Sequence, residues 1–262
     1  MTVAHRGIRL VTFDALHTLI TPRAPIHVQY SNTFAPYLGV LDPDALKRSF
    51  KTALKAVHQT NPTYAKGSSV WWAEVIRRTA LDAGANARDV DEHLAKIVPR
   101  LLQVFSSREG YKAFDDALPV LSRLKKLGIS TAVVSNADSR MHMAIRDLEL
   151  SHFLDPVVLS EEAKFAKPSP EIFLEALRRV SPSIKPEECL HVGDELEADY
   201  RGATAAGIHA LLLRRPGDTE AHVEPGENLA DVETIQDLDG IFRWMLSRDV
   251  ITTRGSAGST EA

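Results

Sequence analysis

The pattern of hydrophobic and polar positions divides the chain into an early strand, a long helical stretch and a region of alternating strands and helices. Residues 8–13 form a run rich in β-branched and aromatic side chains, which predicts a buried strand ending at Asp14. From residue 26 to about residue 105 the signals are almost all helical, and no strand is needed to explain them. This order indicates a helical domain inserted after the first strand.

Helix-start and helix-stop signals support this insertion. Ser68 or Ser69 is expected to cap a helix that is closed by Gly84, because serine caps helix starts well and glycine commonly follows helix ends. A further helix is predicted over residues 90–104.

After Gly110 the pattern changes to strands that alternate with helices. Such alternation is typical of a parallel sheet with helices on both faces, and ligands of such sheets bind at the carboxyl ends of the strands. The sequence therefore predicts an α/β fold with a Rossmann-like sheet and an inserted helical domain. The predicted strands are residues 129–134, 156–159, 190–192 and 209–213, and the predicted helices are residues 117–127, 140–148, 171–180 and 198–206.

Composition and charge limit the location and the partners. The chain has 262 residues, 44% of them hydrophobic and 25% charged, so it can bury a core without a disulfide or a metal. The formal net charge of −4 argues against nucleic acid and anionic membranes as partners. No segment reaches the roughly 20 apolar residues of a membrane span or has the pattern of a signal peptide. A cytoplasmic protein is expected, with the nucleus as the alternative, and nothing indicates an oligomeric state.

Cys189 is the only cysteine, which excludes an internal disulfide and fits a reducing compartment. It lies in a run that predicts a buried strand. A small core residue is therefore favoured over a reactive thiol.

Polar side chains fall where the predicted strands end, at the edge where ligands would bind. Taken singly, each is as typical of a turn, a helix cap or a solvated loop as of a site. Together they offer two carboxylates that can hold Mg²⁺, and an ammonium with hydroxyl and amide groups that can hold phosphoryl oxygens. This combination indicates phosphoryl transfer to an aspartate nucleophile. The four features are Asp14, Ser135-Asn136, Lys167-Pro168 and Gly193-Asp194.

The order and spacing of these residues resemble the haloacid dehalogenase superfamily over nearly the whole chain, from residue 8 to about residue 246. The helical insertion resembles the α-helical cap that these proteins carry after their first motif. One small branch of the superfamily pairs two tryptophans in the cap, here Trp71-Trp72, with a Val-Gly-Asp sequence, here residues 192–194. The resemblance implies a hydrolase whose substrate is a small phosphorylated molecule.

The resemblance also implies a division into domains. Residues 1–22 and 110–250 are expected to form the α/β core, and residues 23–109 the helical cap. Residues 251–262 contain few apolar side chains and are expected to be disordered.

Carried over by position, the resemblance implies a Mg²⁺ site and a nucleophile. Asp14 corresponds to the nucleophile and to a metal ligand, the backbone carbonyl of Leu16 to a second ligand, and Asp194 to the acidic ligand. Thr18 corresponds to a polar residue near the metal-binding loop, and Asp199 to an acidic residue that supports the site.

The phosphate-binding residues are implied in the same way. Ser135 and Asn136 correspond to the pair that orients the phosphate. Lys167 matches the charge-neutralising lysine better than Lys164 does. Phosphoryl oxygens are thus expected between these side chains and the metal.

The residue at position 16 departs from the pattern of the family's phosphatases. Those enzymes carry a second aspartate there, which protonates the leaving oxygen and then activates water. Leu16 can do neither, and general acid–base help is typically worth about 10²- to 10⁴-fold in rate. Weak or specialised phosphatase activity is expected. The alternative is an impaired scaffold that binds a phosphorylated ligand or a partner protein.

A metal-independent 2-haloacid dehalogenase is a further alternative. Dehalogenases of the superfamily also lack the second aspartate and share the Asp-Ala-x-x-Thr-Leu pattern of residues 14–19. They do not keep Gly193-Asp194 in this metal-binding form, which makes dehalogenation the less favoured activity.

The sequence leaves open the roles of His17 and of the Trp71-Trp72 pair. His17 stands where the family usually has glycine, and its imidazole could carry protons at neutral pH in place of the missing aspartate. The favoured alternative is that His17 faces away from the site or only caps the loop. Trp71 and Trp72 either form the core of the cap or face the cleft and select the substrate.

Overall fold

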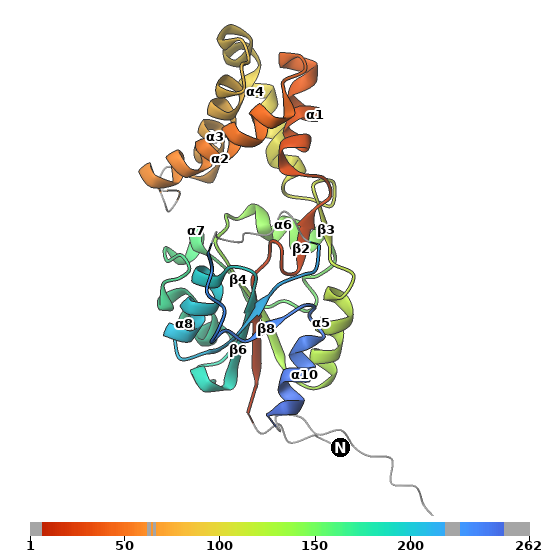
Figure 1. Cartoon of the computed structure of the whole chain (residues 1–262), viewed down its shortest axis with the longest axis vertical. Helices are drawn as coiled ribbons and strands as arrows, with labels where there is room; N and C mark the ends of the chain where they lie inside the picture. The colour runs from red at the N-terminus through yellow and green to blue at the C-terminus, as the bar shows by residue number, and fades with distance from the viewer. Residues whose placement is uncertain (1–6, 62–63, 65–66, 218–225, 249–262) are drawn as a thin grey trace, which may run out of the picture.

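The computed structural model describes residues 7–61, 64, 67–217 and 226–248. These residues form a parallel sheet covered by helices and a separate helical layer beyond one end of the sheet (Figure 1). The predicted disordered tail, residues 251–262, lies outside the described residues.

Six parallel strands form the main sheet, and the first strand of the chain lies inside it. They are β1 (Leu10–Phe13), β4 (Ser130–Ser135), β5 (Val157–Leu159), β6 (Cys189–Gly193), β7 (His209–Leu213) and β8 (Thr234–Ile235). Their order is β5-β4-β1-β6-β7-β8, with every neighbouring pair parallel. The carboxyl ends of β4, β1 and β6 therefore meet at one edge. The predicted α/β fold with a Rossmann-like sheet is confirmed.

Helices cover both faces of this sheet. Side chains of β1 alternate between two hydrophobic cores, with Val11 and Phe13 in the first and Leu10 in the second. Cys189 lies in the second core with no exposed surface, as predicted. The first core contains α5 (Ala117–Lys126), α6 (Arg140–Asp147) and α10 (Gly240–Ser247), and the second contains α8 (Pro170–Val180) and α9 (Gly202–Ala205). Short helices α7 (Ser160–Ala163), η1 (Pro186–Glu188) and η2 (Leu196–Arg201) complete this layer.

Four helices form the second layer, inserted between two short antiparallel strands, β2 (Ile20–Pro22) and β3 (Tyr111–Ala113). The helices are α1 (Ile26–Leu38), α2 (Pro43–Thr60), α3 (Ser68–Asp82) and α4 (Ala87–Val104). They have hydrophobic cores of their own, with buried side chains such as Phe34 and Leu46. In Figure 1 this layer stands beyond the end of the sheet at which β1 leads into β2. The helical insertion is thus present, and the domain boundaries given above stay a prediction.

The structure departs from the sequence-based expectation at short elements. Strands β2, β3 and β8 were not expected, because two or three residues are too few to carry a periodic signal. The helix that Ser68 or Ser69 was expected to cap begins at Ser68 itself, with Gly67 in the capping position.

The helix predicted over residues 198–206 is instead a π-helix, η2, followed by α9. The wider turn arises because the N–H groups of Asp199 and Tyr200 both donate to the carbonyl of Glu195, at 2.9 and 3.3 Å. Such π turns are often found at functional sites.

The two adjacent tryptophans of α3 have different surroundings. Trp71 is 4% exposed and packs against Ala53 and Val57 of α2. Trp72 is partly exposed, and its indole N–H donates to Oδ2 of Asp138, at 2.7 Å, in the loop after β4. Trp71 therefore belongs to the core of the helical layer, while Trp72 joins this layer to the sheet.

Replacing Trp71 by alanine is expected to lower the free energy of unfolding by about 3–5 kcal/mol, because a large buried ring is lost. Urea denaturation followed by circular dichroism measures this change. Val70→Ala is the matched control on the same helix, since Val70 is 57% exposed, and it is expected to change stability by less than about 0.5 kcal/mol. Equal effects of the two substitutions would contradict the packing described.

Candidate active site

Asp14 lies at the carboxyl end of β1, in the middle of the sheet. Its side chain is buried, and Oδ1 accepts a hydrogen bond from Nζ of Lys167 at 2.5 Å. Burial and the charge of Asp199 raise the pKa of Asp14, and the charge of Lys167 and hydrogen bonds from Lys167 and Ser135 offset only part of this rise. Lys167 is therefore the group that compensates the buried side chain of Asp14.

Lys167 is not at the end of a strand, contrary to the sequence-based expectation. It lies in the loop between α7 and α8 and is brought to the site by Asn136. The Asn136 amide donates to the Lys167 carbonyl at 2.9 Å and accepts from its N–H at 2.7 Å. Asn136 thus positions the lysine, and its predicted contact with phosphate stays a prediction.

The ammonium of Lys167 is shared between two carboxylates. Nζ lies 2.5 Å from Oδ1 of Asp14 and 2.6 Å from Oδ1 of Asp199, with only 3% of the lysine side chain exposed. Burial opposes the charged form, but the two carboxylates raise the pKa of Lys167 above its usual range. The lysine stays a cation at every physiological pH. Lys164, the alternative in the sequence, ends α7 in a left-handed conformation.

Asp199 is fixed by three donors from three segments. Oδ1 accepts from Lys167 and lies 3.1 Å from Nε2 of His191, and Oδ2 accepts from the N–H of Glu195 at 2.9 Å. Burial raises the pKa of Asp199, but Lys167 and His191 outweigh it and hold the pKa below its usual range. Asp199 is therefore an ionised supporting residue with both oxygens engaged.

Asp194 follows β6 and brings a further carboxylate to the same place. It is 4% exposed, and Oδ1 accepts from the hydroxyl of Thr18 at 3.3 Å. Burial and then the charges of Asp14 and Asp199 raise the pKa of Asp194 to about 8. Ligand oxygens of the three aspartates lie within 4.8 Å of one another.

The three aspartates, Asp14, Asp194 and Asp199, are suited to hold a divalent cation. Mg²⁺ prefers oxygen ligands, and the repulsion that raises the pKa of Asp194 is what a bound cation would relieve. Because both oxygens of Asp199 are already bonded, Asp14 and Asp194 are the side chains best able to bind the metal directly. The carbonyl of Leu16, in the turn after Asp14, remains the predicted third donor.

Two arginines that follow β7 hold the loops of this site, and the sequence did not indicate them. Arg214 donates to the carbonyl of Asp194, and Arg215 donates to the carbonyl of Thr18 at 3.0 Å. Arg215 also pairs with Asp116 at 2.9 Å. A charged residue just after a strand gives no sign of its partner in the sequence.

Leu16 and His17 form the turn between Asp14 and β2. Leu16 is partly buried and packs against the first core. His17 has φ of 62°, and its N–H donates to the carbonyl of Ile20 at 2.7 Å. This left-handed conformation favours glycine and is tolerated by histidine. The turn geometry thus accounts for the glycine usual in the family, and a proton-carrying role of His17 stays a prediction.

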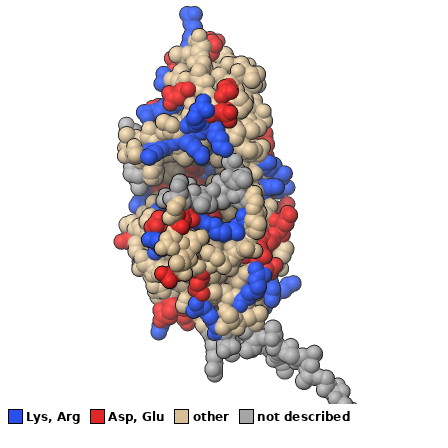
Figure 2. All heavy atoms as spheres, viewed as in Figure 1, with Lys and Arg blue, Asp and Glu red and all other residues tan. Residues whose placement is uncertain are grey.

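The helical layer approaches the site near the loop after β4. Arg140 pairs with Asp138 at 2.7 Å, and its guanidinium lies 4.5 Å from the centre of the Trp72 ring. Near Arg140 lies a cavity of about 370 Å³. It is lined by Ser68 and Gln103 from the helical layer and by Arg140 from the layer that contains the sheet. On the face drawn in Figure 2, lysine and arginine side chains gather where the helical layer faces the hollow between the layers. Their charge suits an anionic ligand.

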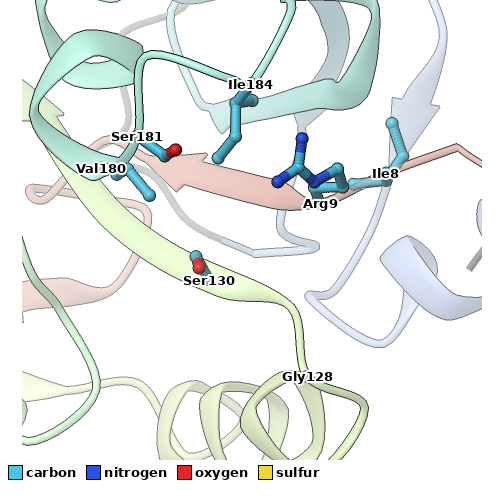
Figure 3. A pocket seen from close by; sticks show the side chains of 7 residues that line it. All are labelled: Ile8, Arg9, Gly128, Ser130, Val180, Ser181 and Ile184. Atoms are coloured by element: carbon cyan, nitrogen blue, oxygen red, sulfur yellow. The ribbon is translucent and has the colours of Figure 1, made fainter. Parts of the chain in front are cut away.

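A second hollow, of about 380 Å³, lies at the opposite end of the sheet (Figure 3). Arg9 and Ser130 line it at the amino ends of β1 and β4, whereas Asp14 and Ser135 lie at the carboxyl ends. None of its seven lining residues is acidic. This hollow is separate from the carboxylate cluster.

Comparison with known sequences identifies the family. A sequence profile of the haloacid dehalogenase-like hydrolases matches residues 8–207. The haloacid dehalogenase-like hydrolase domain-containing protein 3 of Bos taurus is 35% identical over 219 residues, which make up 82% of this chain and 85% of that protein. The resemblance inferred from the motifs is confirmed.

Solved structures agree with this assignment. The 2-haloacid dehalogenase of Pseudomonas syringae pv. Tomato DC3000 matches with a TM-score of 0.63 at 25% identity, over 92% of this chain and 99% of that one. The magnesium-bound HAD-hydrolase YfnB of Bacillus subtilis matches with a TM-score of 0.66 at 20% identity, over 92% of this chain and all of that one. At such identity the second match shows the fold alone.

Gly193 is expected to be irreplaceable even by alanine, because an added Cβ would overlap the carboxylate of Asp199. Gly193→Ala must displace Asp199 and is expected to lower the free energy of unfolding by about 1–3 kcal/mol. Thermal and urea denaturation of the purified variant measure this effect. A variant as stable as wild type would contradict the close packing of the two residues.

Proposed function

The chain belongs to the haloacid dehalogenase-like hydrolase family, and from that premise we propose that it binds Mg²⁺ and a small phosphorylated molecule at Asp14. It hydrolyses this molecule slowly, through attack by the aspartate. The observation that carries the proposal is the buried ammonium of Lys167 between Asp14 and Asp199, beside the carboxylate of Asp194.

Each of these side chains has a task in phosphate binding. Lys167 has three N–H groups, of which two donate to Asp14 and Asp199, so one is left for a phosphoryl oxygen. The hydroxyl of Ser135 donates to Asp14 and could turn its single O–H to a phosphoryl oxygen instead when one is bound. A cation held by Asp14 and Asp194 would neutralise the remaining phosphate charge.

In the first step, an oxygen of Asp14 attacks phosphorus and the bond from phosphorus to the ester oxygen breaks. The products are an aspartyl phosphate and the leaving alcohol, which must take a proton. Leu16 provides no proton, so this proton comes from water, and leaving groups that are stable as anions are favoured. The chain is thus suited to activated phosphates.

In the second step, water attacks the aspartyl phosphate, releases phosphate and restores Asp14. A general base normally takes the proton of that water, and Leu16 cannot. The second step is therefore expected to be the slower one, and the aspartyl phosphate should accumulate.

The two alternative functions, a dehalogenase and an impaired scaffold, predict different behaviour of the Asp14 carboxylate. In a dehalogenase, Asp14 would attack the carbon that bears the halogen and release halide without a metal. The 2-haloacid dehalogenase fold match at 25% identity favours this candidate, while the Asp194 carboxylate beside Asp14 favours the metal-dependent one. An impaired scaffold would bind Mg²⁺ and phosphate and release no product.

The proposed compartment is the cytoplasm, because the chain has a single cysteine. Among the described residues, no helix is both long and apolar enough to cross a bilayer. The proposed ligand is a small phosphorylated molecule, and the negative net charge weighs against nucleic acid.

Leu16→Asp is expected to raise Mg²⁺-dependent hydrolysis of p-nitrophenyl phosphate and of a panel of phosphate esters, because it restores a general acid and base. The gain should exceed tenfold, toward the about 10²- to 10⁴-fold typical of such groups. Phosphate release with and without Mg²⁺ measures it.

Leu16→Asn is the matched control for this gain, because it has the same size as aspartate and no acid, and it should not raise the rate. Asp14→Asn should abolish the wild-type activity. Halide release from 2-chloropropionate in the presence of a chelator, without phosphate release from any ester, would instead establish the dehalogenase.

His17→Gly is expected to retain at least half of the wild-type phosphatase activity, because the left-handed turn accepts glycine and the favoured interpretation gives the imidazole no part in proton transfer. Steady-state assays at pH values from 5.5 to about 8.5 test this. A loss of tenfold or more in His17→Gly, with an unchanged circular dichroism spectrum, would make His17 the proton carrier.

A further inference from the structure

His191 is a completely buried polar side chain in the middle of the sheet, and the chemistry described above does not use it. It lies on β6 and has no exposed surface. Its ring packs edge-on against Phe173 of α8, with 5.0 Å between ring centres. A buried imidazole is costly unless both nitrogens find partners.

Both nitrogens of His191 have a partner. Nδ1 lies 2.8 Å from the hydroxyl of Thr12 on β1, and Nε2 lies 3.1 Å from Oδ1 of Asp199. Parallel pairing places Thr12 and His191 directly opposite each other in neighbouring strands. The contact is therefore built into the register of the sheet.

The charge of Asp199 determines which group donates and which accepts in the hydrogen bonds of His191. An ionised carboxylate only accepts hydrogen bonds, so the proton of the neutral ring must be on Nε2. Nδ1 then accepts, and the hydroxyl of Thr12 must donate to it. One continuous line of side chains results: Thr12, His191, Asp199, Lys167 and Asp14.

The contact between His191 and Asp199 affects the position of the Lys167 ammonium. Oδ1 of Asp199 accepts from both His191 and Lys167. Without His191, Asp199 would keep the bonds from Lys167 on Oδ1 and from Glu195 on Oδ2, but no group on β6 would fix the direction of Oδ1. Asp199 and Lys167 could then shift together, and the ammonium would be held less firmly beside Asp14.

We propose that His191 is a positioning residue that, oriented by Thr12, holds Asp199 so that Lys167 stays between Asp14 and the phosphoryl group. This inference rests on the proposed function of the site. It assigns a task to two residues that touch neither the metal-binding carboxylates Asp14 and Asp194 nor the substrate.

The test is the affinity for beryllium fluoride in the presence of Mg²⁺, because this anion imitates a phosphoryl group on an aspartate. Thr12→Val has nearly the shape of the wild-type residue and removes the donor to Nδ1. It is expected to weaken beryllium fluoride binding at least tenfold, in the range of about 10- to 100-fold usual for residues that orient ligands. Isothermal titration of the folded protein measures this.

Thr12→Ser keeps the hydroxyl and is the matched control, expected to bind within threefold of wild type. His191→Gln, whose amide can still donate to Asp199, is expected to bind more tightly than His191→Leu. A purely structural role would lower the unfolding temperature of Thr12→Val and leave the affinity of the folded protein unchanged.

The outcomes separate this inference from the function on which it rests. If wild type binds beryllium fluoride with Mg²⁺ and Thr12→Val binds equally well, the role of His191 is overturned and the proposed function stands. If wild type itself binds none, the proposed function falls, and the positioning role falls with it. Weak binding by Thr12→Val together with rescue by Thr12→Ser supports both.

Discussion

The ion pair between the ammonium of Lys167 and the carboxylates of Asp14 and Asp199 is the contact on which the site depends. All three groups are buried, and removing Lys167 would leave two buried carboxylates without the ammonium that pairs with both. Two neighbouring side chains hold this ion pair in place. Asn136 bonds the main chain of Lys167, and His191 bonds Asp199.

The ion pair of Lys167 with Asp14 and Asp199 also limits which reactions the site can support. The side chains of Asp14, Asp194 and Asp199 lie around one buried ammonium, that of Lys167, and burial followed by the charges of Asp14 and Asp199 raises the pKa of Asp194. A divalent cation would relieve the repulsion among these carboxylates, which supports the proposed metal-dependent activity. Leu16, packed against the first core, supplies neither a general acid nor a general base, so breakdown of the aspartyl phosphate is the slow step of the proposed function.

Much of this arrangement could be predicted from the sequence. The buried run before Asp14 and the Gly193-Asp194 pair at a strand end identify an edge of a parallel sheet, because strand ends in such folds meet there. Lys167 could be recognised only by its resemblance to a family motif, since its position depends on a loop held by a side chain 31 residues earlier. His191 was hidden because a polar residue within a strand gives no sign of its partner. The π turn at Asp199 was not predicted, because one wider backbone hydrogen bond, from the N–H of Tyr200 to the carbonyl of Glu195, does not show in the periodicity of the sequence.

In the proposed function, Asp14 is the nucleophile of a site that lacks the usual general acid. The central point of the proposed function is that attack still occurs and that its product, the aspartyl phosphate, is slow to break down. Acid quenching of wild type after incubation with Mg²⁺ and acetyl phosphate, followed by mass spectrometry of its peptides, tests this directly. We predict a phosphoryl group on the peptide that contains Asp14, absent from Asp14→Asn and reduced in Leu16→Asp. An unmodified peptide in wild type, under conditions in which phosphate is released, would contradict it.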